Sequence, residues 1–593
     1  MEKKITVIRL FLSLAALMPG RSKLLIALAA LPALAAGLFT SLVPEFMGRF
    51  VDACMSSGNM VYPLIMLALC YLLNDFTAAG RKLMVENVAT DFSAALKLKA
   101  AAKILRLDLD FLNEQRTGGL TSKLESSVSG SVKLVKLVFT DLVPSFFIMV
   151  FAIYFAFRQS MVVGSVLIVI LPLCAIVVIW QLKNQNGVRA GIMKSNENMQ
   201  AAISEMIYGI EEIRIADYVN EQLSKISGIA TEIRAGDFGH HKSMVIFNAT
   251  RNSIKWIFHI VLLAVSAYLA VNHRISFGSI ITNSLLFMAA VKPVEEIYRY
   301  FDELQESALR AKEMLNILTE FPQDPSYSMH SVHTNVSTDK IAIKIENLSY
   351  ESAGLAGRNI ISNVSANIYK GEFVGLVGPS GCGKTSLLRN ILMISNGLGL
   401  VYINGIPHNN LSRANLALHI MYVPQSPFIF KGTLRENMVF GAKRYVTDNE
   451  LMDAAAKSGL CGFIAERKNG LDSLITERGT NLSGGQRQRI SISRAFINHE
   501  KPIIVLDEAT SAIDNLTEAK IYSQLLSTGR TIVSVVHRLN ILTEADRIIV
   551  MGSNGTVVQQ GTYNELLFAE GVFSELAAAE TVNAESNTES TYK

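Results

Sequence analysis

The sequence predicts a membrane α-helical domain of six transmembrane helices with long cytoplasmic extensions, followed by a soluble α/β domain. Of the 593 residues, 50% are apolar and only 18% are charged, whereas about 25% of an average soluble chain is charged. The mean hydropathy of +0.30 is correspondingly high. The apolar residues gather before residue 292, and short β-branched runs alternate with helical segments beyond residue 340. A single soluble domain is therefore excluded.

Charge and cysteine content exclude some other classes. The net charge is +4, from 55 Lys plus Arg against 51 Asp plus Glu, which gives no argument for a nucleic-acid partner. The five cysteines show neither CxxC pairs nor metal-ligand spacing. Neither a disulfide framework nor a zinc site is indicated, and most of the chain is expected to face a reducing compartment.

The membrane domain is expected over residues 1–320. A bilayer span needs about 20 apolar residues, and one such stretch alone could instead be a buried core helix. Six together favour membrane spans. Their cores lie at residues 24–43, 61–79, 138–157, 161–182, 254–271 and 275–291.

The connections between these spans predict the topology. The two long connections, 80–137 and 183–253, hold 18 Lys plus Arg, whereas the three short ones hold only Arg49, Arg158 and Arg274. The positive-inside rule places the long connections and both termini in the cytoplasm, as in a multi-pass protein of the plasma (inner) membrane. Residues 1–17 imitate a signal peptide, but an interfacial helix on the inner leaflet is preferred.

The long connections carry helix formers, so the spans are expected to continue as helices into the cytoplasm. Each connection then needs a turn, and plausible ones lie at about 108–118 and 210–220. These stretches mix apolar residues with acids, which suits either a docking helix or an ordinary hairpin tip. After the membrane domain we expect a linker over 321–339, an α/β domain over 340–579 and a disordered tail over 580–593.

A phosphate-binding loop is the first functional motif in the second domain. Residues 378–385 match the pattern G-x-x-x-x-G-K-[ST], after a strand-like run and before a helical one. Such a loop closes backbone N–H groups around phosphate oxygens, Lys384 neutralises phosphate charge, and the Thr385 hydroxyl can ligate Mg²⁺. The predicted nucleotide-binding residues here are Gly378, Ser380, Gly381, Cys382, Gly383, Lys384, Thr385 and Ser386.

Two acids end a second strand-like run, 503–508. Adjacent carboxylates after four apolar residues suit a metal site better than a solvated strand end. Asp507 is therefore expected to hold Mg²⁺, and Glu508 to polarise the attacking water as the catalytic base.

The segment 482–486, Leu-Ser-Gly-Gly-Gln, lies about twenty residues before that strand. With both phosphate motifs in order it resembles the signature of ABC ATPases. The chain as a whole resembles an exporter-type ABC half-transporter, in which a six-helix transmembrane domain is fused to one P-loop ATPase domain. The resemblance implies an ATP hydrolase coupled to transport. It also implies that 108–118 and 210–220 are coupling helices.

The resemblance also assigns roles to matched positions. Tyr350 corresponds to the aromatic residue that stacks on adenine, and Gln425 to the glutamine that senses Mg²⁺ and the attacking water. His537 corresponds to the catalytic switch histidine at the γ-phosphate, and Asp514 to the loop that links two ATP sites. The signature residues would complete the ATP site of another domain, and they are Ser483, Gly484, Gly485 and Gln486.

Because one chain holds one ATPase domain, the resemblance implies a dimer with two ATP sites. Glu508, His537 and the signature are all intact, which favours a homodimer. A related half-transporter remains the alternative partner. No nucleic-acid partner is expected.

Basic residues in the fifth span are candidates for substrate contact. Arg251, Lys255 and His259 recur at i, i+4 and i+8 and so share one helix face. Ionisable residues at this depth usually face a cavity, where they would meet an anionic or polar group of the substrate. Snorkelling of the two basic residues, with His259 bonded between helices, explains the pattern equally well.

Three functions remain open at this level. The first is ATP-driven export of an amphipathic substrate (a peptide, drug or lipid) by alternating access. Because no cysteine-peptidase domain precedes the first span, leader cleavage is not expected. The second is import of a metal-siderophore complex with the same fold. The third is a membrane ATPase that gates or regulates without pumping.

Overall fold

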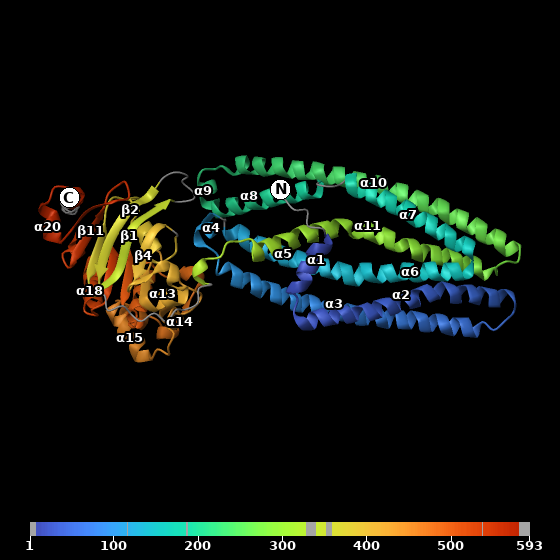
Figure 1. Cartoon of the computed structure of the whole chain (residues 1–593), viewed down its shortest axis with the longest axis horizontal. Coiled ribbons are helices and arrows are strands. Elements are labelled where there is room, and N and C mark those ends of the chain that lie inside the picture. Colours follow the sequence, from blue (N-terminus) through green and yellow to red (C-terminus); the bar gives the residue numbers. More distant parts are fainter. Residues whose placement is uncertain are drawn as a thin grey trace. The chain divides into compact units, whose positions relative to one another are not determined.

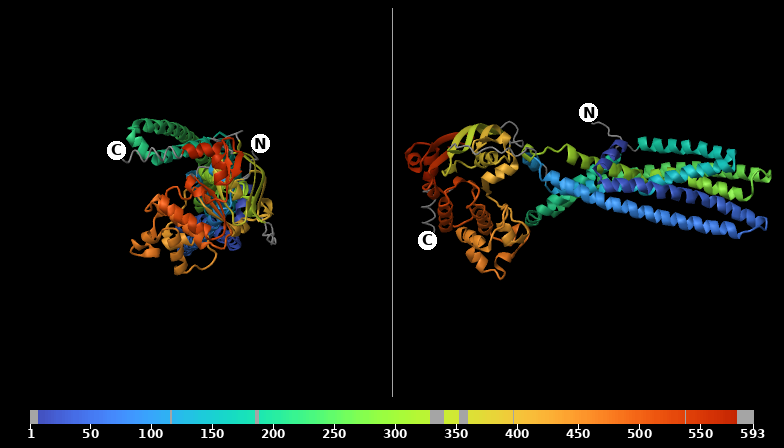
Figure 2. Two further views of the ribbon diagram at one scale, coloured as in Figure 1. Left: turned by 90° about the vertical axis from the view of Figure 1, so that its left-hand side faces the viewer. Right: turned by 60° about the horizontal axis from the view of Figure 1, so that its bottom comes forward.

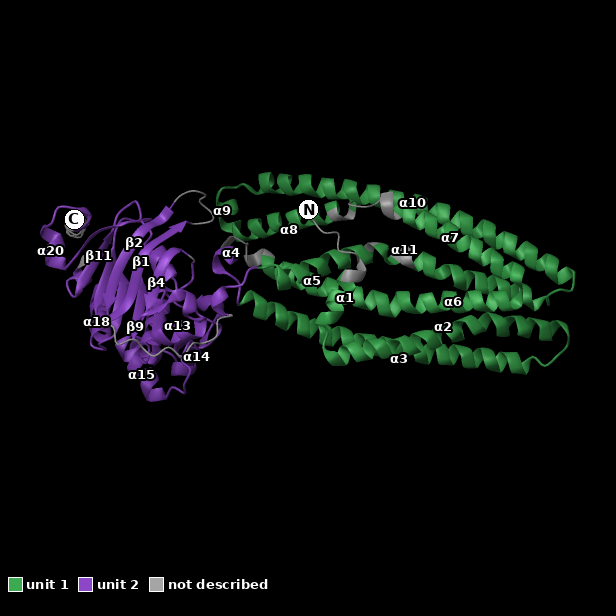
Figure 3. Cartoon of the chain, in the orientation of Figure 1, with its two compact units in different colours: residues 1–105, 115–321 green, residues 106–114, 322–593 purple. Residues whose placement is uncertain are grey.

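The computed structural model describes residues 7–114, 117–184, 188–327, 340–351, 359–395, 397–536 and 538–579. They form two compact units, residues 1–105 with 115–321 and residues 106–114 with 322–593 (Figure 3). His537, most of the expected linker and the expected tail lie outside the described residues.

Unit 1 is helical, and its two long connections are helical as the sequence predicts (Figure 1). Its elements are α1 (Val7–Leu17), α2 (Gly20–Met55), α3 (Val61–Ile104), α5 (Thr117–Lys136), a π-helical segment (Leu137–Leu142), α6 (Val143–Gln159), α7 (Met161–Asn184), α8 (Val188–Tyr208), α9 (Ile210–Ile215), α10 (Val219–Val271) and α11 (Gly278–Thr319).

Five helical stretches in the described part of the chain are long and apolar enough to cross a membrane. They are Gly20–Met55, Val61–Ile104, Leu120–Gln159, Met161–Gln181 and Val219–Val271. The expected sixth span, 275–291, falls in α11, where Thr282, Asn283 and Ser284 interrupt the apolar run. The sixth crossing therefore stays a prediction, and its helix begins at Gly278 rather than at residue 275.

Small residues let the long helices approach closely. α2 and α3 lie side by side in Figure 1 and in the right-hand view of Figure 2, and α2 buries Ala29, Ala33 and Ala36. α2 also meets α11, because a Cβ placed on either Gly48 or Gly278 would collide with the facing helix. Close backbone approach through small residues is the usual way in which membrane helices pack.

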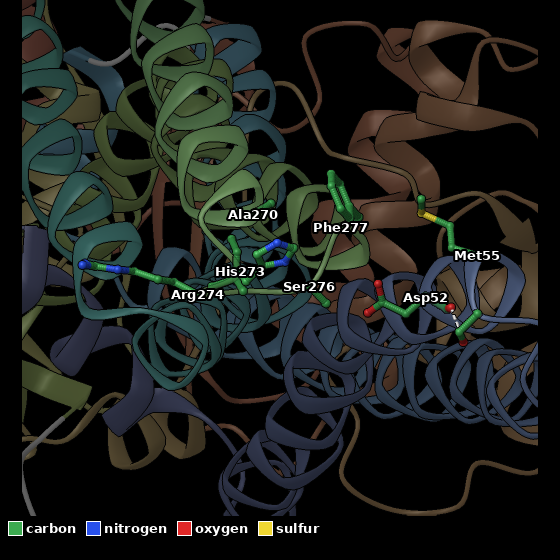
Figure 4. Close-up of a pocket in the computed structure, with 9 residues that line it drawn as sticks. Asp52, Met55, Ala270, His273, Arg274, Ser276 and Phe277 are labelled. Carbon is green, nitrogen blue, oxygen red and sulfur yellow. Dashed lines mark hydrogen bonds between the residues drawn. The ribbon is translucent and has the colours of Figure 1, made fainter.

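A cavity of about 600 Å³ lies where α2 ends, beside the turn between α10 and α11. The Asp52 carboxylate accepts a hydrogen bond from the Gly278 backbone N–H, at 2.7 Å, at the start of α11. Arg274 points away from Asp52 (Figure 4). A carboxylate at a helix N-terminus is electrostatically favourable, so Asp52 fixes α11 to α2 at this end.

The described residues of unit 2 form three sheets, of which the smallest pairs β7 with β8. The six-stranded sheet has the order β12-β11-β3-β10-β9-β6 and is parallel except for β12, and the four-stranded antiparallel sheet has the order β2-β1-β4-β5. The strands are β1 (Ile341–Glu351), β2 (Asn359–Tyr369), β3 (Phe373–Val377), β4 (Leu398–Ile403), β5 (Ile406–Pro407), β6 (Ile420–Val423), β7 (Gly432–Thr433), β8 (Leu474–Ile475), β9 (Ile503–Asp507), β10 (Thr531–Val535), β11 (Arg547–Met551) and β12 (Val557–Gly561).

Helices cover the six-stranded sheet, whose strands β3, β9 and β10 are buried throughout. Continuous apolar strands of this kind are typical of a parallel sheet between helical layers. The α-helices of unit 2 in the described residues are α4 (Leu109–Glu114), α12 (Lys384–Ile391), α13 (Arg413–His419), α14 (Leu434–Met438), α15 (Asp448–Lys457), α16 (Cys461–Ala465), α17 (Gly484–Ile497), α18 (Asn515–Leu526), α19 (Leu539–Leu542) and α20 (Tyr563–Phe568).

Candidate nucleotide site

The expected phosphate-binding residues meet at one edge of the six-stranded sheet. The phosphate loop follows β3, Asp507 ends β9, and Gln425 lies two residues after β6. These strands are parallel and joined through β10, so their carboxyl ends share this edge. Ligands of open α/β sheets bind outside the carboxyl ends of the strands.

The phosphate loop is closed around its own lysine. The Lys384 Nζ donates to the carbonyl oxygens of Gly378, at 2.8 Å, and Pro379, at 3.0 Å. Gly383 begins α12 with φ +102°, and a Cβ there would meet the Ile360 carbonyl oxygen at 2.7 Å. Only glycine fits such a position, and the N-terminus of α12 is left facing the loop, as phosphate binding requires.

The residues of the phosphate loop differ in their exposure to solvent. Ser380, Gly381 and Thr385 are exposed, whereas Cys382, Gly383 and Lys384 are buried; Gly378 and Ser386 are intermediate. Cys382 is only 2% exposed, packed in the core beneath the loop. The Cys382 side chain therefore packs in the core, whereas Ser380 and Thr385 leave their hydroxyl groups at the surface.

Two of the residues expected to hold Mg²⁺, Thr385 and Asp507, are hydrogen-bonded to each other. The Thr385 hydroxyl donates to Asp507 Oδ1 at 3.0 Å, and the Tyr422 hydroxyl donates to Asp507 Oδ2 at 3.3 Å. Burial raises the pKa of Asp507, although both hydroxyl donors oppose that rise. A hydroxyl and a buried carboxylate are hard oxygen ligands, so this pair fits Mg²⁺.

Glu508 stands next to this pair, where the chain leaves β9. It adopts a left-handed conformation, with φ +48°, which is costly for a residue other than glycine and is concentrated at functional sites. Its carboxylate accepts a short hydrogen bond from the Gln425 side-chain amide. The expected base and the expected sensor of the attacking water therefore contact each other.

Gln488 is a residue that sequence reasoning missed. It lies on α17 and is 4% exposed. Its amide nitrogen donates to the Gln425 backbone carbonyl, at 3.2 Å, and to the Ser511 hydroxyl, at 3.0 Å, while its amide oxygen accepts from Ala512 N–H at 2.9 Å. Gln488 thus ties the signature helix to Gln425 and to the loop before Asp514.

The signature segment forms the start of α17. Ser483 is the N-cap, and Ser483 and Gln486 exchange hydrogen bonds as a capping box. A Cβ on Gly485 would meet the Ala512 carbonyl oxygen at 2.7 Å, which explains a glycine there, whereas Gly484 lies one residue nearer the cap. Asp514 in turn caps α18 by accepting from Thr517 N–H at 2.9 Å.

Tyr350 lies on β1 and packs against the core cluster that includes Leu387 and Leu388. Its hydroxyl donates to Asp110 of α4 at 3.2 Å. The expected adenine contact would use the face of the ring and stays a prediction. The segment that follows, 352–358, lies outside the described residues.

In unit 1 the expected substrate residues all have partners. The Lys255 ammonium forms an ion pair with Glu295 of α11, at 2.8 Å, and lies 4.6 Å from the centre of the Trp256 ring. His259 bonds the Ser284 hydroxyl at 2.8 Å, and the buried Arg251 donates to Asn248 at 2.8 Å. On this face the charge of Lys255 is therefore balanced by Glu295, while Arg251 bonds Asn248 and His259 bonds Ser284.

Two family profiles and a protein relative match this chain. The ABC transporter family profile matches residues 361–511, and the ABC transporter transmembrane region profile matches residues 26–294. The mesentericin-Y105 transport/processing ATP-binding protein MesD of Leuconostoc mesenteroides is 28% identical over 94% of this chain and 76% of its own length.

A second transport protein and a solved structure are also similar to this chain. The lactococcin transport/processing ATP-binding protein LcnC-like of Lactococcus lactis is 26% identical over 86% of this chain and 70% of its own length. The structure of a bacterial Atm1-family ABC exporter with ATP bound has a TM-score of 0.82 at 20% identity, covering 94% of this chain and 99% of that one.

The phosphate loop, the paired acids and the signature thus occur in a chain whose helical unit matches the transmembrane region of the same family. Such half-transporters generally work as dimers in the membrane. The chain belongs to the ABC transporter family, as an exporter-type half-transporter that couples ATP hydrolysis to transport.

Proposed function

We propose that this half-transporter exports an amphipathic substrate, foremost a peptide, as a homodimer with two ATP sites. The observation that carries the hydrolytic part is the position of Lys384, the Thr385–Asp507 pair and the Gln425–Glu508 pair at one sheet edge. The names of the bacteriocin transport relatives support a peptide. The N- and C-termini and the ATPase domain lie in the cytoplasm.

The ATP-binding step uses the loop and the start of α12. The N–H groups of the loop and of α12 bind the β- and γ-phosphates, and Lys384 exchanges its contacts with Gly378 and Pro379 for phosphate oxygens. Thr385, Asp507 and Gln425 would hold Mg²⁺, which neutralises phosphate charge. The Ser483–Gln486 segment of a second copy would cover the γ-phosphate, since in one chain it caps α17.

In the hydrolytic step Glu508 accepts a proton from the attacking water, and Gln425 holds the Glu508 carboxylate in place. His537 would contact the γ-phosphate. Closure of two ATPase domains around two ATP molecules would switch the membrane cavity from inward to outward facing, and hydrolysis would reset it.

The proposed substrate contact is the basic face of α10, Arg251, Lys255 and His259, with Glu295 opposite. A peptide carries both amide groups and charges, and the Lys255–Glu295 pair offers one charge of each sign. Polar residues at this depth are expensive unless they are paired or used. The substrate is expected to exchange its own polar groups for one partner of this pair.

Measurements of ATP-dependent transport test the proposed substrate contact. Lys255→Ala and Glu295→Gln should each lower ATP-dependent peptide transport at least fivefold, because each leaves its partner without a counter-charge. Basal ATP hydrolysis should persist in both. Lys292→Ala, which removes a more exposed Lys–Glu pair of α11, is the matched control. Wild-type transport by both pair variants would discard the substrate contact.

The direction and substrate class are tested in inverted membrane vesicles. Three fluorescent probes are offered: a cationic amphipathic peptide, a hydrophobic dye and a phospholipid analogue. The proposal expects ATP-dependent uptake of the peptide into the lumen. Loss of a preloaded probe from the lumen upon ATP addition would indicate import instead.

A further inference from the structure

Asp110 fastens α4 to the ATPase core. Within unit 2, Asp110 Oδ1 accepts hydrogen bonds from the Tyr350 hydroxyl, at 3.2 Å, and from the Ser395 hydroxyl, at 3.3 Å. Ser395 is 4% exposed and lies four residues after the end of α12. One carboxylate therefore joins α4 to strand β1 and to the turn that follows the phosphate-loop helix.

The start of the linker pairs with the chain that leads into α4. Asp108 N–H donates to the Pro322 carbonyl at 3.1 Å, Asp324 N–H donates to the Arg106 carbonyl at 3.0 Å, and Leu107 bridges antiparallel to Gln323. Two segments that are far apart in the sequence, 106–108 and 322–324, are thus joined through their backbones.

Arg413 connects this pair of segments to α12. Its guanidinium donates to Asp324 Oδ2 at 2.6 Å, to the Leu392 carbonyl at 2.7 Å and to the Met393 carbonyl at 2.6 Å. Leu392 is the C-cap of α12. The last carbonyls of a helix have no partner within the helix and carry partial negative charge. The planar, always charged guanidinium of Arg413 bonds two carbonyls and a carboxylate through N–H groups in a fixed plane, a geometry that the single nitrogen of a lysine ammonium reproduces only in part.

We propose that Arg413, Asp324, Asp110 and Ser395 form a clamp that makes the phosphate-loop helix, the linker start and α4 move as one body. α12 has eight residues and begins at the loop that binds phosphate. A shift at its first turn, when ATP binds, is carried to its last turn because a short hydrogen-bonded helix moves as a unit. The clamp then passes that shift to α4 and to the linker.

Both α4 and the linker start are connected along the chain to helices of unit 1. α4 lies between α3 and α5, and Pro322 follows the end of α11 at Thr319 by three residues. Arg413 and Asp110 are therefore positioning residues, which act through α12 and touch no nucleotide atom. The inference rests on the coupling of ATP hydrolysis to transport and not on the peptide substrate proposed above.

The two tryptophans supply a reporter that needs no label. The sequence contains only Trp180 and Trp256, which lie on α7 and α10 of unit 1. A change in acrylamide quenching of tryptophan fluorescence upon addition of MgATP and vanadate thus reports movement in the membrane helices. The full-length protein in lipid nanodiscs is used, with binding of radiolabelled ATP measured on the same samples.

Arg413→Ala and Asp110→Ala should each lose more than half of the ATP-induced change in quenching. The dissociation constant for ATP should stay within twofold of that of the wild type, because Arg413 bonds the far end of α12 from the loop and Asp110 bonds the Tyr350 hydroxyl rather than the face of its ring. Arg467→Ala and Asp453→Ala remove surface residues of the same types that contact Phe463 and Lys457. These two controls should respond as the wild type does.

A second set of variants separates the clamp from a general loss of structure. If Asp324 acts through Arg413, then Asp324→Asn added to Arg413→Ala should reduce the response no further than Arg413→Ala alone, since contacting residues are not additive. Arg413→Lys should keep an intermediate response.

Three outcomes would overturn the clamp: a full quenching response in both alanine variants, tenfold weaker ATP binding in both, or additive losses in the double variant. A wild-type protein with no response at all would overturn ATP-driven movement and the clamp together. The failure of the clamp alone is therefore distinguishable from failure of the transport function.

Discussion

Glu508→Gln is expected to lower the turnover of ATP about 100- to 1000-fold while ATP binding is kept. A general base contributes about this factor, which corresponds to about 3 to 4 kcal/mol of barrier. The amide has nearly the shape of the carboxylate and can still contact Gln425, but it cannot accept a proton from water. Phosphate release by the purified protein and binding of radiolabelled ATP are the two measurements.

The matched control is Glu500→Gln, which changes an exposed acid close to β9 in the sequence. It should leave both measurements unchanged. Full ATP hydrolysis by Glu508→Gln would show that another group accepts the proton. Loss of ATP binding would mean that Glu508 supports the loop rather than the reaction.

Lys384→Ala is expected to weaken ATP binding about 100-fold, so that hydrolysis becomes undetectable at millimolar ATP. Lys384 is only 7% exposed and bonds the loop carbonyls of Gly378 and Pro379. The substitution removes the positive charge that would contact the phosphates. It also removes the two hydrogen bonds that hold the loop in shape. A charge-assisted contact to phosphate and its geometry together account for about 3 kcal/mol.

Lys468→Ala, an exposed lysine of the same domain, is the control and should bind ATP as the wild type does. Thermal unfolding distinguishes loss of the phosphate contact from collapse of the loop, because the phosphate contact raises the melting temperature only when ATP is added, whereas collapse of the loop lowers it without ATP. If ATP still raised the melting temperature of Lys384→Ala as it does for the wild type, the assigned role of Lys384 would be wrong.

The sequence predicts the phosphate loop well because its information is local. Glycine spacing, a lysine and a hydroxyl stand within eight positions, and strand and helix flanks confirm the context. Asp507 and Glu508 follow the same logic, since four apolar residues before two acids indicate a buried strand that ends at a site. Both sets lie at one sheet edge in the structure.

The contacts that sequence reasoning missed are long-range and use residue types without a motif. Gln488 is an ordinary helix residue until Gln425, 63 positions away, and Ser511 supply its partners. Arg413 reaches Asp324 across 89 positions. Neither pairing leaves a periodic signal in one sequence, because each depends on how separate elements pack.

The fifth span also depends on long-range contacts that the sequence alone does not reveal. The i, i+4, i+8 spacing correctly placed Arg251, Lys255 and His259 on one helix, but their partners Glu295 and Ser284 belong to α11. The sequence left open either a substrate contact or snorkelling with His259 bonded between helices, whereas the structure shows the Lys255–Glu295 pair and the His259–Ser284 bond. The sixth span stays a prediction, because polar residues that bond neighbouring helices lower the hydropathy of that stretch.

The central claim is that ATP hydrolysed at the Lys384, Asp507 and Glu508 site drives export. The most direct measurement is uptake of a fluorescent amphipathic peptide by inverted membrane vesicles that carry either the wild-type chain or Glu508→Gln. The account predicts uptake that requires MgATP and is lost in Glu508→Gln although the peptide still binds. Equal uptake by both proteins, or ATP hydrolysis by the wild type with no movement of peptide, dye or lipid probe, would contradict it.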